Sequence, residues 1–263
     1  VAPILLLRGY SVEIACRLAD KIVVVTPNLI DFLVGLGIKR EKIVAVSNGV
    51  NTEKFMPRDS VDCKRSAGLD PGLSYIGFVG SLVAWQGVEY LIEAFARLSG
   101  EGYSNHRLLI VGDGIEKASL IELAQQLGIS ENLIFAGVQP HHQIPIWIGS
   151  CDLLIAPKKP LQSGYSPLKI YEYMACGRPV LASNVEGLEF IQTDHIGLLF
   201  EPGNVDDLTC KLRMLLDLPV GERSEMGERA RKLAVERHSW DRTIQHIRRF
   251  LLQNHKQSVD YEA

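Results

Sequence analysis

The sequence has no strong excess of charge of either sign. Its 28 lysine and arginine residues face 31 aspartate and glutamate residues, which gives a formal net charge of −3 at pH 7. Proteins that hold nucleic acid through bulk charge are strongly basic. The charge balance therefore excludes nucleic acid as a partner bound in that way.

Long hydrophobic runs are missing as well. Aliphatic runs such as Ile4–Leu7 fall far short of the roughly 20 apolar residues that a membrane-spanning helix requires. Hydrophobic residues still make up 46% of the 263 positions, the ordinary share for a globular core. This length predicts one large domain, or one domain with pieces of another.

Cysteine is sparse and scattered. The 5 cysteines form no C-x-x-C pair, and their odd number argues against a disulfide framework. We therefore expect reduced and mostly buried thiols, and a cytoplasmic location.

Several familiar signatures of catalysis are also absent. The chain contains no D-x-D sequence, no Walker A or G-x-S-x-G motif, and no complete G-x-G-x-x-G. No group of histidine, cysteine and aspartate has the spacing of metal ligands, and the adjacent His141 and His142 point in different directions. We expect no metal site and no cofactor other than a substrate.

What is present is an alternation of short apolar runs with helical patterns. Solid apolar runs suit strands that are covered on both faces, as in parallel sheets. The order predicts an α/β fold with a doubly wound parallel sheet. The predicted strands lie at 22–25, 43–46, 76–79, 108–111, 133–135, 153–156, 179–182 and 198–200, and the predicted helices at 9–19, 27–36, 88–98, 115–127, 167–176, 204–217 and 221–255.

The turn-rich sequence Ser47–Asn51 interrupts this pattern. Asn-Gly is a favoured hairpin turn, but Thr52–Arg58 makes a poor second strand, so we favour a crossing between domains. The charged stretch at 221–255 could cross back. It carries an apolar seam made of Trp240, Ile244, Ile247, Phe250 and Leu251.

Two glycine-containing loops follow predicted strands, where parallel sheets bind ligands. In the loop at 80–87, Gly80 lets a ligand approach the backbone, and the helix that follows can hold an anion. A purely structural glycine is the alternative, and Trp85 could simply cap the core. In the loop at 112–114, Asp113 could equally be only the N-cap of the next helix.

A third loop leads into a short helix with clear end signals. Ser166 is a good N-cap, Pro167 fits the first helical position, and Gly177 is typical of the residue after a helix. The spacing predicts a helix from Pro167 to Cys176. Its inward face is expected to carry Leu168, Tyr171 and Ala175.

Two charged residues lie near the start of this helix. Lys169 opposes the helix macrodipole there, which makes sense if an anion is bound. A diphosphate would accept hydrogen bonds from the free N–H groups and from Lys169, and Glu172 could accept the paired hydroxyls of a sugar. The alternative is a surface ion pair between Lys169 and Glu172. Without a metal, protein groups must neutralise the anion.

Together these segments resemble the retaining glycosyltransferases of family 4, which have the GT-B fold. The resemblance covers residues 43–217 and follows the family's order of motifs. The most similar segment is Ser166-Pro167-Leu168-Lys169 followed by Glu172-Tyr173-Met174-Ala175-Cys176-Gly177. The other matching segments are Ser47–Asn51 with Phe55 and Pro57, Phe78–Ser81 with Trp85–Val88, Leu109–Gly114, Phe135–Val138 and Cys151–Pro157.

The resemblance implies roles for individual residues. Glu172 matches the family's ribose-binding glutamate, whereas the glutamate that contacts the donor sugar falls at Gly164. The family's phosphate-binding arginine and lysine fall at Ser81 and Gln86, which leaves Lys169 as the main cation for the diphosphate. Lys169 and Glu172 are the implied catalytic residues. The implied donor-binding residues are Gly80, Ser81, Gln86, Gly112, Val138, Gly164, Tyr165, Ser166, Pro167, Leu168, Lys169 and Glu172, with Val138 beside the base.

The resemblance also implies a two-domain enzyme. Residues 61–235 would bind a nucleotide-diphosphate sugar such as a UDP- or GDP-sugar. Residues 1–50 would be the end of an acceptor domain that is mostly missing, 51–60 a linker, and 236–263 a helix that crosses back. The reaction would transfer the sugar, with retention of configuration, to a hydroxyl of an acceptor glycan, lipid or small molecule. A lipid acceptor would add peripheral membrane association.

Other functions share this architecture. A nucleotide-sugar-binding module without turnover would use the same site, and a nucleotide-sugar epimerase would change the sugar without transferring it. The incomplete G-x-G-x-x-G argues against a nicotinamide-dependent dehydrogenase. If the rest of an acceptor domain docks on this chain, an exposed apolar face is expected at 1–46 and 240–252.

Overall fold

The computed structural model describes residues 12–160 and 167–252. Within these ranges the chain divides into two compact units. The larger unit contains 50–160 and 167–239, and the smaller unit contains 12–49 and 240–252.

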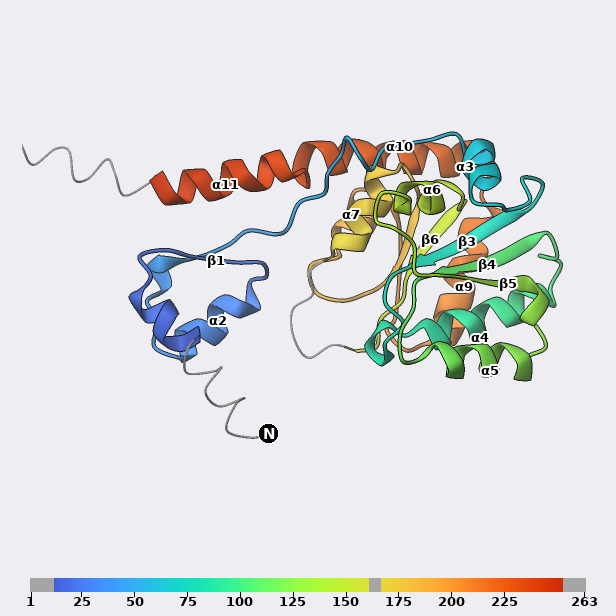
Figure 1. The fold of residues 1–263 in the computed structure, drawn as a ribbon, viewed down its shortest axis with the longest axis horizontal. Coiled ribbons are helices and arrows are strands. Elements are labelled where there is room, and N and C mark those ends of the chain that lie inside the picture. Colours follow the sequence, from blue (N-terminus) through green and yellow to red (C-terminus); the bar gives the residue numbers. More distant parts are fainter. Residues whose placement is uncertain (1–11, 161–166, 253–263) are drawn as a thin grey trace, which may run out of the picture. The chain divides into compact units, whose positions relative to one another are not determined.

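The larger unit is built on a 6-stranded parallel sheet with the order β5-β4-β3-β6-β7-β8 (Figure 1). This arrangement confirms the predicted α/β fold with a parallel sheet. The order reverses between β3 and β6, and parallel sheets bind ligands in the crevice at such a switch point. The strands are β3 (Ser74–Val79), β4 (His106–Val111), β5 (Leu133–Gly137), β6 (Leu153–Ala156), β7 (Val180–Ser183) and β8 (Gly197–Phe200).

Helices cover both faces of this sheet. On one face lie α4 (Val88–Ser99), α5 (Lys117–Gln126) and α9 (Val205–Asp217) (Figure 1). On the other lie α6 (Ile144–Gly149) and α7 (Leu168–Ala175), with α3 (Ser60–Ser66) packed on α6 and α10 (Val220–Arg237) packed on α7. The short α8 (Phe190–Thr193) leads into β8. The residues of β6 and β7 are all buried, as their solid apolar sequences predict.

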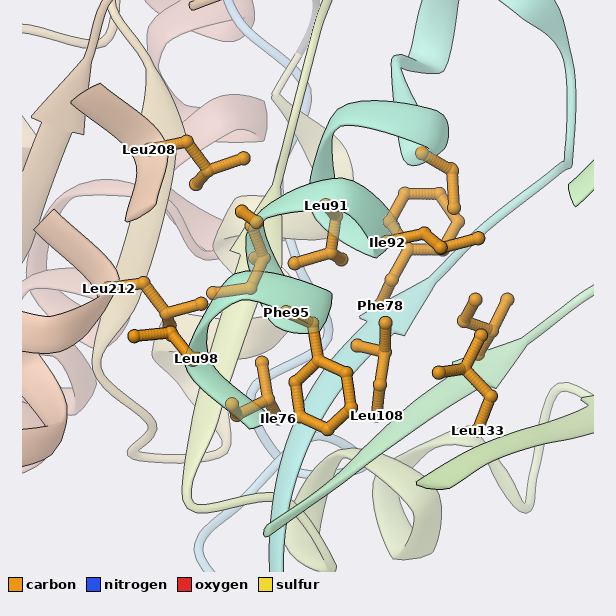
Figure 2. Close-up of a cluster of buried hydrophobic side chains, with 14 of the residues drawn as sticks. Ile76, Phe78, Leu91, Ile92, Phe95, Leu98, Leu108, Leu133, Leu208 and Leu212 are labelled. Carbon is orange, nitrogen blue, oxygen red and sulfur yellow. The ribbon is translucent and has the colours of Figure 1, made fainter. Parts of the chain in front are cut away.

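The main core lies between the sheet and the face covered by α4 and α9. Figure 2 shows Leu91, Phe95 and Leu98 of α4 pointing towards the strands and towards α9. Burial of each such side chain contributes about 1.5–3 kcal/mol. The spacing of these apolar residues therefore holds α4 against the sheet. It also fixes the position of the loop at 80–87, which leads into this helix.

The smaller unit holds a parallel pair of strands joined by a helix. β1 (Ile22–Val24) pairs with β2 (Ile43–Ala45), and α2 (Asn28–Gly35) connects them. A helix also covers 12–18, within the predicted range 9–19. α11 (Trp240–Leu252) belongs to this unit, where the Thr243 hydroxyl donates to the carbonyl oxygen of Ser47 at 3.1 Å.

The chain passes between the units at two adjacent places. The N–H of Val50 donates to the carbonyl oxygen of His238 at 2.8 Å, and Val50 forms a parallel bridge with Ser239. The predicted helical stretch at 221–255 is therefore broken, because α10 ends at Arg237 and α11 begins at Trp240. Asn48 and Gly49 lead into this bridge and no strand follows them in the described residues 51–73, so the hairpin alternative is wrong. The division between the two compact units falls at this place, between Gly49 and Val50.

The segment expected as a linker at 51–60 packs on the larger unit. Phe55 is buried, and Arg231 of α10 donates to the carbonyl oxygens of Thr52 and Phe55 at 3.0 and 2.8 Å. All 5 cysteines are free thiols, of which Cys63, Cys151 and Cys176 are buried. Among the described residues, no helix is long and apolar enough to cross a bilayer.

Candidate functional site

The loops that follow β3, β4 and β5 are joined by backbone hydrogen bonds at the carboxyl edge of the sheet. The N–H of Gly80 donates to the carbonyl oxygen of Val111, and the N–H of Gly112 donates to that of Gly137, both at 2.9 Å. The loops thus continue the sheet beyond its strands. They form one hydrogen-bonded wall that begins at the switch point.

Close backbone packing explains the glycines in this wall. Gly112 has a φ of +136°, and a Cβ atom there would lie 1.9 Å from the carbonyl oxygen of Gly80. A Cβ on Gly114 would lie 2.1 Å from the carbonyl oxygen of Leu82. At Gly80, with a φ of +155°, a Cβ would lie 2.6 Å from Nζ of Lys169. These positions need glycine whether or not a ligand is bound.

Asp113 is not the N-cap of the next helix, so that prediction is wrong. The helix α5 begins at Lys117, after Glu116. Asp113 instead accepts the N–H of Gly114 and the ammonium of Lys117, each at 2.8 Å. The hydrogen bond from Lys117 lowers the pKa of Asp113. The Asp113 carboxylate therefore stabilises the loop at 112–114, because its hydrogen bonds join this loop to the first residue of α5.

The helix α7 differs from its prediction at its first turn. It begins at Leu168, so Pro167 occupies the N-cap rather than the first helical position. Leu168 is exposed rather than inward, whereas Tyr171 and Ala175 are buried as expected. Gly177, with a φ of +69°, ends the helix as predicted. Ser166, the expected N-cap, lies outside the described residues.

A buried tyrosine fixes α7 against the end of β3. The Tyr173 hydroxyl accepts the N–H of Val79 at 2.9 Å and donates to the carbonyl oxygen of the same residue at 3.1 Å. Val79 is the last residue of β3 and precedes Gly80. The start of α7 is thereby held beside the loop at 80–87.

Two lysines share one amide oxygen at the switch point. Oε1 of Gln86 accepts from Nζ of Lys169 at 2.8 Å and from Nζ of Lys158 at 3.0 Å. Gln86 comes from the loop after β3, Lys158 from the loop after β6, and Lys169 from the first turn of α7. We call these three residues the lysine–glutamine cluster.

Sequence reasoning did not identify Lys158. Its side chain is fully buried, and its ammonium lies 3.7 Å from the centroid of the Trp85 ring. The buried Ser183 hydroxyl at the end of β7 accepts its N–H at 2.8 Å and donates to its carbonyl oxygen at 3.1 Å. The sequence did contain one signal, because Lys158 lies two residues after the buried strand 153–156, at the end of a parallel strand where ligands bind.

Burial sets the protonation of the cluster. It lowers the pKa of Lys158 to about 7. Burial and the neighbouring Lys158 together lower the pKa of Lys169 well below its ordinary value. Aromatic faces partly offset this cost, since the Lys169 ammonium lies 4.2 Å from the Phe78 ring centroid. Two cations that converge in this way can neutralise a multiply charged anion.

Glu172 lies one turn further along α7 and forms no hydrogen bond with Lys169. It faces Nε2 of His141 at 3.7 Å, and Nδ1 of His141 contacts the ammonium of Lys54. Burial raises the pKa of Glu172 to about 7. Lys169 and Glu172 therefore do not form the surface ion pair that was the alternative. Lys169 bonds to Gln86, and Glu172 faces His141.

The remaining predicted site residues are dispersed. Ser81 and Val138 are exposed, and Trp85 is half exposed with Lys158 over its ring. Gly164, Tyr165 and Ser166 lie outside the described residues. Within 12–160 and 167–252, no group of three or more histidine, cysteine, aspartate and glutamate residues could hold a metal ion.

Residues 62–233 match the model of a protein family described as "Glycosyl transferases group 1". The chain belongs to this family. The match covers the whole sheet and all members of the lysine–glutamine cluster. The resemblance inferred from the motifs is confirmed at this level.

Sequence relatives agree with the family. An uncharacterized glycosyltransferase from Methanocaldococcus jannaschii is 31% identical over 209 residues, which cover 76% of this chain and 51% of that protein. A D-inositol 3-phosphate glycosyltransferase from Segniliparus rotundus is 29% identical over 208 residues, covering 77% of this chain and 45% of that protein. The chain thus spans about half the length of these relatives.

Solved structures show the same fold. Sucrose-phosphate synthase from Thermosynechococcus elongatus matches with a TM-score of 0.77 and 22% identity, over 92% of this chain and 60% of that chain. HepE from Anabaena, in complex with UDP and glucose, matches with a TM-score of 0.78 and 21% identity, over 93% and 66%. The glycosyltransferase group 1 member described here therefore has a GT-B type architecture.

Proposed function

We propose that this chain is the donor-binding part of a retaining glycosyltransferase. It transfers a sugar from a nucleotide-diphosphate sugar, such as a UDP- or GDP-sugar, to an acceptor hydroxyl. The lysine–glutamine cluster at the switch point carries the proposal, because it gathers two buried cations where parallel sheets bind ligands. Family membership and the UDP complex of HepE support it.

In this proposal the diphosphate takes the place of the Gln86 amide oxygen between Lys158 and Lys169. Both ammonium groups then donate to phosphate oxygens. Negative charge grows on the diphosphate as the bond to the sugar breaks, so fixed cations stabilise the transition state more than the ground state. Each charge-assisted hydrogen bond is worth about 1.5–3 kcal/mol. The two lysines thus neutralise the diphosphate in place of the family's arginine and lysine, whose positions are occupied here by Ser81 and Gln86. No metal ion is needed in this scheme.

Glu172 binds the ribose in the same scheme. Its carboxylate accepts the two ribose hydroxyls, and the exposed Val138 flanks the base. The distance from the cluster to Glu172 is one helical turn, which suits a ribose attached to the diphosphate. Roles for Gly80, Gly112 and the segment at 164–168 in holding the donor remain predictions.

The acceptor side involves the smaller unit in this proposal. Residues 1–50 and 236–263 belong to an acceptor-binding domain, and the acceptor is a glycan, a lipid or a small molecule. Exposed apolar side chains in this unit support a further docking surface, as expected from the sequence. They are Val12, Ile14, Leu18, Phe32, Trp240, Ile244, Leu251 and Leu252. The free thiols agree with a cytoplasmic enzyme.

The test is a calorimetric titration of UDP, GDP and uridine against single variants. We expect Lys158→Met, Lys169→Met and Glu172→Gln each to weaken binding of the preferred nucleotide at least tenfold. The two lysine variants should leave uridine binding unchanged, because uridine carries no phosphate. Lys159→Met is the matched control, since Lys159 is adjacent in sequence but pairs with Glu89 at 2.7 Å. Equal losses in Lys159→Met and Lys158→Met would contradict the site.

A binding module without turnover is the second candidate, because the lysine–glutamine cluster would bind the diphosphate in the same way without transfer. The two candidates share the site and differ in catalysis. Incubation of the chain with UDP-glucose and analysis of the products separates them. Released UDP and a glycosylated acceptor indicate a transferase, unchanged donor at normal affinity indicates a binding module, and an altered sugar on UDP indicates an epimerase.

A further inference from the structure

A basic cavity lies in the larger unit, at the end of α7 opposite Lys169. Its volume is about 380 Å³, which is within the range of small-molecule sites. It shares no residue with the lysine–glutamine cluster. The α7 helix has 8 residues and is therefore about 12 Å long, and it separates the cavity from Lys169 by most of this length. The lining residues are Pro57, Arg58, Cys176, Gly177, Arg178, Ser224, Glu228, Arg231 and Lys232.

The cavity has a preformed wall. A Cβ on Gly227 would lie 2.1 Å from the carbonyl oxygen of Gly177, so α10 touches the end of α7 at the level of the backbone. Arg231 donates to the carbonyl oxygens of Thr52, Phe55 and Ala175 at 2.8–3.0 Å. This arginine therefore has a structural role, because it ties the segment after the crossing to both helices.

The other cations of the cavity lack an anionic partner. The side chains of Arg58 and Lys232 make no hydrogen bond or ion pair within residues 12–160 and 167–252. Arg178 donates through Nη2 to the carbonyl oxygens of Gly149 and Arg58, while its Nε is buried without an acceptor among the described residues. Like charges repel, so this grouping is unfavourable unless an anion offsets it.

The chemistry of the lining selects the kind of anion. Guanidinium groups and an ammonium are suited to the oxygens of a phosphate group. Ser224 and Glu228 lie one turn apart on α10 and can bind a neighbouring hydroxyl. Glu228 is the single carboxylate of the lining and would repel a ligand that carried negative charge at both ends. A monoanionic or dianionic head with a hydroxylated tail fits this pattern.

We propose that this cavity binds a phosphate monoester, with Arg58, Arg178 and Lys232 around the phosphate and Ser224 and Glu228 beside an adjacent hydroxyl. The proposal does not depend on the transfer reaction proposed above. The phosphate monoester can belong to a free metabolite or to a lipid headgroup, and the experiment distinguishes these sources.

The experiment titrates glycerol 3-phosphate into the full chain by calorimetry. We expect the double variant Arg58→Gln/Lys232→Gln to weaken binding at least tenfold. Both side chains are exposed and unbonded, so this variant should fold, and a circular dichroism melt verifies it. Arg65→Gln is the control for loss of a surface cation on an exposed helix, and Lys169→Met disables the lysine–glutamine cluster. Both should bind within twofold of the original chain.

A second arm measures sedimentation with phosphatidylcholine vesicles that contain phosphatidic acid. Vesicle binding that is lost in the double variant, without binding of glycerol 3-phosphate, supports a lipid headgroup as the source. Binding of glycerol 3-phosphate with the same variant dependence supports a free metabolite. The proposal is overturned if neither probe binds, if the double variant binds like the Arg65→Gln control, or if Lys169→Met abolishes binding.

Discussion

At the level of single residues, Lys158 and Lys169 lie in an interior that disfavours the charged form of both side chains. Burial lowers the pKa of Lys158 to about 7 and that of Lys169 well below its ordinary value. An anion placed between them raises both pKa values again, because it stabilises the ammonium forms. The empty cluster therefore holds fewer protons at neutral pH than the occupied cluster.

From this difference we predict that UDP binding takes up protons. Above pH 7 the empty cluster loses protons that the complex retains, so the association constant should fall as pH rises from 7 to 8.5, by up to about tenfold per pH unit for each proton taken up. Calorimetry at pH 8 in buffers of different ionisation enthalpy measures the uptake. Lys158→Met should reduce it, whereas Glu172→Gln should not, since Glu172 is already ionised at this pH. A titration without proton uptake would refute the coupling.

At the level of elements, α7 links the two ends of the candidate site. Its first turn carries Lys169, its second turn carries Glu172, and Tyr173 anchors it to the last residue of β3. A small shift of this helix would move both functional groups with respect to the sheet. The geometry of the site thus depends on one buried hydroxyl that has no part in binding.

We predict that Tyr173→Phe lowers both stability and donor affinity. Removal of the hydroxyl leaves the buried N–H of Val79 without this acceptor, which costs about 1–3 kcal/mol of the free energy of unfolding. UDP affinity should fall about threefold or more, because Lys169 loses its fixed position. Tyr75→Phe is the control, since its hydroxyl bonds to Asp70 away from the site. It should change stability alone, and equal effects of both variants on UDP affinity would argue against the anchor.

The loops after β3 and β4 form a second element whose geometry is testable. Gly112→Ala should lower the free energy of unfolding by about 2–5 kcal/mol, because the new Cβ meets the Gly80 carbonyl and φ is positive. Gly128→Ala has a positive φ but no atom within 4 Å, so it should cost only about 1 kcal/mol. Urea denaturation measures both. Similar losses would show that the loops are not closely packed.

At the level of the whole molecule, the larger unit contains the described residues of the candidate site. All strands of the 6-stranded sheet, the main core and the lysine–glutamine cluster fall between Val50 and Ser239. The two crossings pair with each other at those residues, so the ends of this segment are adjacent. This segment has its own hydrophobic core, and its two ends lie next to each other, as is usual for an independent domain.

We predict that residues 50–239 fold alone and bind UDP within about threefold of the full chain. The measurement is a thermal melt followed by the same calorimetric titration. A folded segment that no longer binds UDP would show that residues 1–49 or 240–263 contribute to the donor site. The full chain serves as the control in both measurements.

The succession of strands along the chain could be predicted from the sequence, whereas the short helices α3, α6 and α8 were missed. Each expected strand from 22–25 to 198–200 is present, because fully buried parallel strands need solid apolar runs and these are short-range features. The end of α7 at Gly177 was predicted for the same kind of reason, since a residue with a positive φ favours glycine locally. The family resemblance likewise rested on motifs that are contiguous in sequence, and the family match confirms it.

The cationic site could be predicted only in part, because it joins residues that are distant along the chain. Lys169 and Gln86 were expected to bind the donor, whereas Lys158 was not identified. Gln86, Lys158 and Lys169 meet only through the strand order of the sheet, which places the ends of β3 and β6 side by side. Local sequence predicted a surface ion pair for Lys169 as the alternative and gave no role to Lys158. The sequence by itself thus determined the strands, most of the longer helices and the family, since those depend on near neighbours. Only the tertiary structure decided which charges share a buried space, because strand order and burial are properties of the whole fold.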